Sequence, residues 1–441
     1  MSMIQPKFQS QPCFLAFVLG GLLSTCGLVV TDVSAETGVA LLGDELRVNT
    51  YVDNNQSFPE IAVAPDGSAV VTWESIGQDG SNHAVAAQRY NPDGTPRGAE
   101  FIVNTETEDT QSQPSVAMAA DGSFIIFWRS KFQDGSEFGL YAQRYGASGA
   151  PVGGEFRVSV ATDGNQEDAH AAFDADGNML VAYQSPDSAS SGVFARLYDA
   201  AGQPGDEFRV NDTTGEWQQD PEVIATPGGF VVAWASRQVD ADNRAILLKR
   251  YSADGTPVGD EQQVNTTEVG DQRLPGLAAR PDGTFAVVWE SLDQDGSDAA
   301  AIARIYDPSG APVTGEIQLN QTTADAQENL AVAYDGRGGF VVVWDGDAPS
   351  GGSFDEIWGR RLLASGALDG DEFRINTHTT NRQVFPAIAA GQGGELMAVW
   401  HSWTGDGSGT SVAGQRLRIT GVFEDGFETG DTSAWSRVVT P

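Results

Sequence analysis

Residues 111–128 have the sequence QSQPSVAMAADGSFIIFW, and this stretch contains the features from which the fold can be inferred. A Gln is followed three residues later by Pro114, then by small residues, a turn and an apolar run. Because Gly accepts positive φ, Asp121-Gly122 predicts a chain reversal between two strands. The run 124–128 has no polar/apolar alternation, which predicts a strand buried on both faces.

This unit occurs seven times along the chain, with starts 52 to 56 residues apart. The copies begin at Gln56, Gln111, Gln166, Gln218, Gln272, Gln327 and Gln383. Their apolar runs end at Trp73, Trp128, Tyr183, Trp234, Trp289, Trp344 and Trp400. A period near 50 residues with four short strands in each unit is typical of a propeller or an array. The recurring aromatic residue predicts packing between units, and the recurring Gln predicts a structural role rather than a ring of ligands.

The two ends of the repeat region distinguish a ring from an open stack. Residues 45–49 match the fourth strand of the later copies but precede the first Gln, whereas the seventh copy ends at its third strand, 415–417. The strand counts agree only if the N-terminal strand completes the last blade. We therefore predict an all-β, seven-bladed β-propeller with four strands per blade over residues 44–420, with no open edge at the seam.

The repeat pattern Q-x-x-P, D-G-x-F-V-V-V-W, Q-R-Y and E-F-R-V-N-T resembles one found in secreted bacterial proteins. In architecture it is similar to the seven-bladed kelch-type and WD-type propellers, over about residues 44–420. These families share no single activity, so the resemblance implies a fold and leaves the function open.

Residues 1–35 have the features of an export signal, with an apolar run over 13–30 and small residues at 33–35. We predict cleavage after Ala35 and an extracellular or cell-envelope location. A membrane anchor is disfavoured because Gly, Ser and Thr dilute the run and no second apolar stretch follows. The sequence around Cys26 also resembles a bacterial lipoprotein box, which implies lipid attachment at Cys26 as an alternative.

Residues 421–441 lie outside the repeat and form a C-terminal tail. The tail resembles a segment at the end of secreted proteins of Gram-negative bacteria. It is either a flexible end or a sorting or docking tag. Both cysteines, Cys13 and Cys26, precede the cleavage site, so the cleaved chain has no thiol for a disulfide, a nucleophile or a metal site.

The chain has 61 acidic against 25 basic residues, for a formal net charge of −36. This charge excludes a nucleic-acid partner, which would need an excess of Lys and Arg. With 40% hydrophobic residues the chain is too apolar to be a disordered polyacid. We predict a monomer with no transmembrane helix after removal of the signal.

In a ring, the loops between second and third strands share one face with the loops that lead into the next blade. These loops are rich in acids, among them Glu106, Asp168, Asp220, Glu268 and Asp325. A concave ring of carboxylates favours cations, although acids in turns also serve solubility. The strongest calcium candidate is the turn that carries Asp293, Asp295 and Asp298, although a full EF-hand spacing is absent. Ca²⁺ is the one cofactor predicted.

A ligand site is expected where the sevenfold symmetry breaks. Extra aromatic, His and Arg residues occur in the loops of blades four and seven. We predict ligand binding by Trp217, His378, Arg382, His401 and Trp403. Exposed Trp rings beside acids and His can stack on a sugar or a peptide, although these residues also fit plain loop positions.

The chain contains no G-x-S-x-G elbow, H-E-x-x-H helix or phosphate-binding loop. Our first hypothesis is therefore a non-enzymatic, exported propeller that binds a protein or a glycan through its acidic loop face, assisted by Ca²⁺. The alternative is a glycan or peptide hydrolase or lyase that uses acids and His401 in a central pocket. A third hypothesis is a purely structural surface module.

Overall fold

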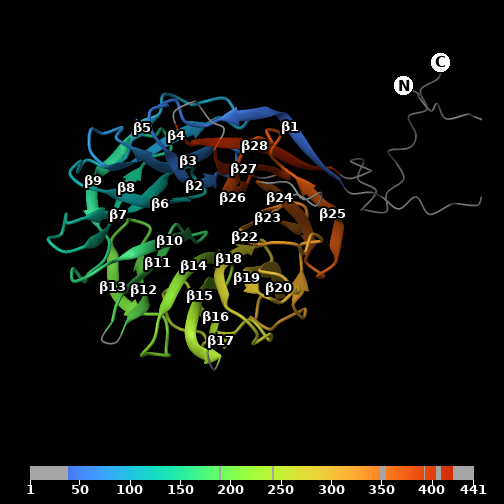
Figure 1. Cartoon of the computed structure of the whole chain (residues 1–441). Helices are drawn as coiled ribbons and strands as arrows, with labels where there is room; N and C mark the ends of the chain where they lie inside the picture. Colours follow the sequence, from blue (N-terminus) through green and yellow to red (C-terminus); the bar gives the residue numbers. More distant parts are fainter. Residues whose placement is uncertain are drawn as a thin grey trace, which may run out of the picture. The chain divides into compact units, whose positions relative to one another are not determined.

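The computed structural model describes residues 38–187, 190–240, 243–347, 354–391, 393–403 and 409–420. The predicted signal segment with Cys26 and the predicted tail lie outside the described residues. Within them, 28 strands form seven four-stranded antiparallel sheets around a common centre (Figure 1). The predicted all-β, seven-bladed propeller is therefore confirmed. The described residues include no helix of the length and apolarity that a membrane span requires.

The first four blades follow one another along the chain. Blade one contains β2 (Gln56–Val63), β3 (Ala69–Ile76), β4 (His83–Tyr90) and β5 (Phe101–Ile102). Blade two contains β6 (Gln111–Met118), β7 (Phe124–Lys131), β8 (Phe138–Tyr145) and β9 (Pro151–Arg157). Blade three contains β10 (Glu167–Phe173), β11 (Met179–Pro186), β12 (Ser191–Tyr198) and β13 (Pro204–Arg209). Blade four contains β14 (Gln218–Thr226), β15 (Gly229–Asp240), β16 (Asn243–Tyr251) and β17 (Gln262–Gln263).

The remaining blades repeat the pattern, and the last one borrows its fourth strand. Blade five contains β18 (Gln272–Ala279), β19 (Phe285–Leu292), β20 (Ala299–Tyr306) and β21 (Ile317–Gln318). Blade six contains β22 (Gln327–Tyr334), β23 (Gly339–Asp347), β24 (Asp355–Leu363) and β25 (Leu368–Arg374). Blade seven contains β26 (Gln383–Ala390), β27 (Glu395–Ser402), β28 (Ser411–Thr420) and β1 (Gly38–Arg47).

The core lies between the blades. Each of the seven apolar clusters joins side chains of two neighbouring blades; for example, Val231 and Ile246 of blade four pack with Trp289 of blade five. Trp289 is fully buried, as are the equivalent aromatic residues of the other blades. The prediction of packing between units is confirmed, and burial of apolar side chains on both faces of each second strand, with one large ring in each, is the main force that holds the propeller together.

The recurring Gln is also structural, as predicted. In six blades its amide nitrogen donates to carbonyl oxygens of the preceding loop, as Gln272 Nε2 does to the Val269 oxygen at 3.1 Å. In blades four, five and seven its amide oxygen accepts from the buried indole, with 2.8 Å between Trp289 Nε1 and Gln272 Oε1. The side chain thus satisfies polar groups that would otherwise be buried unpaired near the start of the first strand.

The ring closes through β1. This strand pairs antiparallel with β28, with Gly38 opposite Thr420 and Arg47 opposite Ala413, and Figure 1 shows the two side by side. β1 begins at Gly38, ahead of the predicted start at residue 44. The carboxylate of Glu45 accepts from Thr377 N at 2.7 Å. The fourth strands of the other six blades make the same contact with the preceding blade. The N-terminal strand therefore completes blade seven, as predicted.

Candidate functional site

The first strand of every blade contains a bulge two residues after the recurring Gln. The ladder register shifts there in each sheet, as between Ser57 and Glu60 in blade one. One non-glycine residue per blade has φ between 49° and 54°, namely Phe58, Gln113, Asp168, Asp220, Leu274, Asn329 and Phe385. L-residues rarely adopt this conformation. Because it recurs in all seven blades, the bulge belongs to the architecture, and we call its seven residues the mouth ring.

Carboxylates of the preceding blades hold several of these bulges in place. Gln113 N donates to Glu74 Oε1 at 2.7 Å, and Phe385 N donates to Asp345 Oδ1 at 3.0 Å. Both acids directly follow the buried aromatic residue of a second strand. These hydrogen bonds from the neighbouring blade help to offset the unfavourable φ of the bulge.

A second ring lies two residues further along the first strands, deeper in the central channel. Its members, called the inner ring, are Glu60, Ser115, His170, Glu222, Gly276, Ala331 and Ala387. Titratable members occur in blades one, three and four, whereas blades five to seven contribute Gly and Ala. Blades one to four thus contribute mostly polar side chains to the two rings and blades five to seven mostly apolar ones, with Phe58 and Asn329 as the exceptions. The backbone bulge itself is the same in all seven blades.

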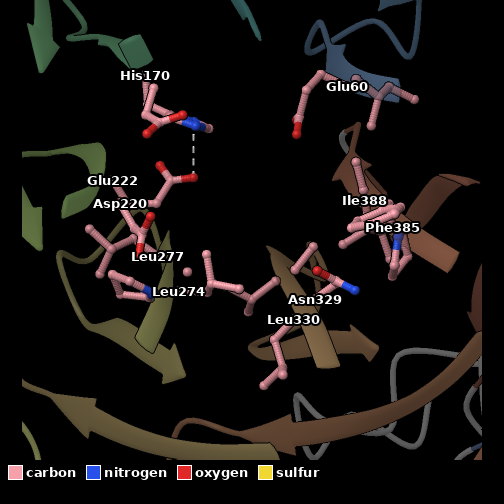
Figure 2. A pocket seen from close by; sticks show the side chains of 18 of the residues that line it. Glu60, His170, Asp220, Glu222, Leu274, Leu277, Asn329, Leu330, Phe385 and Ile388 are labelled. Atoms are coloured by element: carbon pink, nitrogen blue, oxygen red, sulfur yellow. Dashed lines mark ion pairs between the residues drawn. The ribbon is translucent and has the colours of Figure 1, made fainter. Parts of the chain in front are cut away.

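The two rings enclose a central cavity of about 380 Å³. Figure 2 shows Glu60 facing the His170–Glu222 pair across this cavity, with Asn329 and Phe385 on the apolar side. His170 Nδ1 lies 3.1 Å from Glu222 Oε1, and the side chains keep 32% and 27% of their exposure because they face the channel. An outer cavity of about 640 Å³ shares Phe58 and Glu60 with the central one and extends towards blade two.

Two carboxyl groups of the cavity have strongly raised pKa values. Burial raises the pKa of Glu60 to about 7, with a contribution from Glu222 and against the opposing effect of His170. Burial likewise raises the pKa of Asp168 to about 7, aided by the nearby carboxylates of Glu167 and Asp220. At neutral pH the cavity can therefore hold protonated and ionised carboxyl groups together, which acid–base chemistry requires.

His170 has the opposite perturbation. Burial lowers the pKa of an imidazole, but the surrounding carboxylates, Glu222 foremost, raise the pKa of His170 to about 9. The ring is thus an imidazolium at neutral pH and fixes the carboxylate of Glu222 by an ion pair. Burial also raises the pKa of Asp220, against the opposing effects of Arg244 and of the Leu274 N–H.

The raised pKa of Glu60 gives a prediction about stability. Between its ordinary value of 4.5 and about 7 the folded chain keeps a proton that the unfolded chain has released. The free energy of unfolding therefore falls as the pH rises through this window. Glu60→Gln removes the ionisation, so its melting temperature should exceed that of the wild type by about 3 °C at pH 8. Calorimetry at pH 8 and pH 4 tests this; an equal shift at both values would contradict it.

No protein-family model and no curated protein matches the sequence, but solved structures are similar to the fold. A protein of unknown function from Dyadobacter fermentans superposes with a TM-score of 0.54 at 11% identity, over 87% of this chain and 100% of the other.

Two further similar structures are enzymes by their descriptions. The polysaccharide lyase Uly1 has a TM-score of 0.51 at 11% identity, over 85% of this chain and 92% of that one. An α-L-arabinanase of Penicillium chrysogenum, complexed with arabinobiose, has a TM-score of 0.49 at 13% identity, over 85% and 99%. At such identities the likeness establishes the fold alone.

These findings correct our first hypothesis. A non-enzymatic propeller that binds through its acidic loop face needs no buried acid–base cluster, yet the central cavity contains one. The same fold also carries a polysaccharide lyase. The findings favour the alternative, a hydrolase or lyase with its site in the central pocket. The histidine that lines this cavity is His170, and His401 is not among the lining residues.

The five predicted ligand-binding residues do not form one cluster. His401 stacks on Trp403, with ring centroids 6.1 Å apart. Arg382 pairs with Asp355, and His378 Nδ1 lies 2.9 Å from Glu45 Oε1 at the blade seam. Trp217 is exposed on blade four, across the ring from blade seven. Their role in binding remains a prediction.

The structure contains the turn that was predicted to bind calcium, but its described side chains do not form a metal site. Asp295 Oδ1 accepts from Ser297 N at 3.1 Å, and its Oδ2 accepts from Asn320 Nδ2 at 2.8 Å. Asp293 and Asp298 are joined through their backbones. Among the described residues, no group of three or more His, Cys, Asp or Glu side chains is arranged to hold a metal ion. Calcium binding at this turn stays a prediction.

Proposed function

We propose that this chain is a glycan hydrolase whose active site is the central cavity. Glu60 is the proton donor, and Glu222, fixed by His170, is the carboxylate that activates water. The observation that carries the proposal is the Glu60 carboxyl, with a pKa of about 7, facing the His170–Glu222 ion pair across the cavity (Figure 2). Two carboxyl groups in unequal environments are what glycoside cleavage requires.

The reaction balances with these groups and water. Glu60 gives its proton to the glycosidic oxygen while the bond from that oxygen to the anomeric carbon breaks. A water molecule attacks the anomeric carbon and gives its proton to the Glu222 carboxylate. Proton exchange with solvent restores both groups, so the sum is cleavage of one glycosidic bond by one water. His170 keeps the Glu222 oxygen oriented and supplies no proton to the bond that breaks.

Hydrolysis fits this cavity better than elimination. A lyase removes a proton beside a uronate carboxylate and needs a cation or a neutral base to assist. His170 is positively charged but already paired with Glu222, and no Lys or Arg is among the residues that line the central cavity. Peptide hydrolysis through a Ser nucleophile or a metal is not supported, because the described residues of this cavity offer neither Ser beside a base nor a metal cluster. Peptide hydrolysis by a pair of carboxyl groups is distinguished by the casein control below.

The other predictions that remain proposals agree with this function. An exported or envelope-located chain, processed after Ala35 or lipidated at Cys26, meets polysaccharides outside the cell. Its net charge of −36 suits a monomer that stays soluble there. The likeness to the lyase Uly1 is in keeping with a polysaccharide substrate.

The test is turnover of a polysaccharide panel by the wild-type chain. We expect new reducing ends without the ultraviolet absorbance of unsaturated uronates. Unsaturated products would identify a lyase instead, and cleavage of a casein control without glycan cleavage would identify a peptidase. Failure to cleave any member of a panel of neutral and acidic glycans would overturn the proposal.

A further inference from the structure

Four aromatic rings pack in a row where blade seven meets blade one. Phe58 and Phe385 have ring centroids 4.8 Å apart. Phe385 lies 6.1 Å from His401, which in turn lies 6.1 Å from Trp403 with the planes 9° apart. Phe58 is 44% and Trp403 50% exposed. We call these four residues the aromatic ledge.

The ledge is continuous with the candidate active site. Phe58 and Phe385 belong to the mouth ring and line both the central and the outer cavity. Their bulged backbone directs them there, since both have positive φ. Trp403 extends the surface outwards through His401. A chain that leaves the cavity on the side of blades seven and one therefore passes over the ledge.

His401 is the buried ring in this row. Its side chain is more than nine-tenths buried, and neither ring nitrogen has a hydrogen-bond partner in the described part of the chain. Burial, with a smaller effect of Arg382, lowers the pKa of His401 to about 4, so the ring is neutral. His401 therefore supports Trp403 as a neutral, buried ring and takes no part in direct contact with a ligand.

The charges around the two cavities restrict what the ledge can accept. Glu60, Asp168, Asp220 and Glu222 line the central cavity. The described Arg and His side chains that line either cavity each lie within ion-pair distance of a carboxylate, as Arg129 does of Glu167. An anionic sugar therefore finds no unpaired basic side chain among the described residues that line the cavities.

We propose that the aromatic ledge is a sugar subsite that stacks a ring of an uncharged glycan beside the bond that is cleaved. The inference rests on the proposed hydrolase and names its substrate class. Aromatic faces bind the C–H face of neutral pyranose and furanose rings with large contact area and little loss of conformational freedom. Uronate chains are disfavoured because the described lining of the two cavities offers no unpaired basic side chain to their carboxylates.

The test uses the Glu222→Gln chain, which binds without cleaving, titrated by calorimetry with neutral and uronate oligosaccharides of equal length. We expect binding of at least one neutral oligomer and none of oligogalacturonate. Adding Trp403→Ala should weaken binding about tenfold, and Trp403→Phe should retain most of the affinity. Phe132→Ala is the matched control, because Phe132 is equally exposed, at 50%, in the loop after β7 and outside both cavities.

Activity measurements separate this inference from the proposed function. In the active chain, Trp403→Ala should raise KM about tenfold with kcat within about twofold. Cleavage of a neutral glycan with KM unaffected by Trp403→Ala would overturn the subsite while keeping the hydrolase. Binding that depends on Trp403 without any cleavage would keep the subsite and overturn the hydrolase. Uronate binding as tight as neutral binding would overturn the assignment of substrate class.

Discussion

Glu222→Gln is expected to lower kcat on the cleaved glycan by roughly 10²–10⁴-fold while the chain stays folded. Glutamine keeps the shape of the side chain but cannot take the proton of the attacking water. It also removes the partner of the His170 imidazolium, 3.1 Å away. Steady-state kinetics with reducing-end detection measure the loss, and circular dichroism verifies the fold.

The matched control is Glu108→Gln, which makes the same change of charge in an exposed loop on the same face. It should leave kcat within about twofold of the wild type, since surface substitutions away from a site have small effects. Equal activity of both variants would remove Glu222 from the mechanism. Equal loss in both would mean that the face as a whole, and not the cavity, controls the reaction.

The raised pKa of the proposed proton donor, Glu60, predicts how the same reaction depends on pH. Because burial raises the pKa of Glu60 to about 7, the donor is protonated below this value, and kcat should fall as the pH rises through it. Asp168 has a pKa of about 7 as well. Asp168→Asn should keep the falling limb with reduced activity, whereas Glu60→Gln should abolish turnover. The reverse pattern would make Asp168 the donor.

The fold could be predicted from the sequence because every blade repeats the same packing arrangement. A buried aromatic residue, a Gln such as Gln272 at the start of the unit and an apolar second strand recur at nearly fixed spacing, so one unit predicts all seven. The unmatched strand at 45–49 then predicted closure by strand count alone. Local pattern and global architecture agree at these positions, which is why the prediction succeeded.

The site was only partly predictable, because its positions do not share one residue type. The mouth ring has positive φ without Gly, so no residue marked the bulge. Asp168 and Asp220 were recognised as acids of the correct face but not as neighbours of His170. The inner ring, with Glu60 and Glu222, was missed. A usable signal existed: at the second and fourth positions after each Gln the chemistry varies widely, whereas the packing positions around them hardly vary.

The largest effect on stability is expected from removal of β1, residues 38–47. The deletion exposes the backbone edge of β28, the Leu46 side chain is lost from the cluster around Trp73, and the Glu45–Thr377 contact disappears. A propeller opened at one seam also loses the mutual support of its first and last blades. We expect the melting temperature to fall by more than about 10 °C, with aggregation through the bare edge.

A circular permutant is the control for this deletion, because loss of stability in the deletion alone would not identify its cause. Gly38 lies opposite Thr420 in the ladder, so a short Asn-Gly turn can join residue 420 to residue 38, with the new ends placed in the loop 50–55. The permutant has the same strands in the same sheet and lacks only the native connection. It should melt within about 5 °C of the wild type, since loop connections contribute little beside strand pairing and core burial. Two outcomes would contradict this prediction: a β1 deletion as stable as the wild type, or a permutant as unstable as the deletion. In either case the pairing of β1 with β28 would not determine the stability of the propeller.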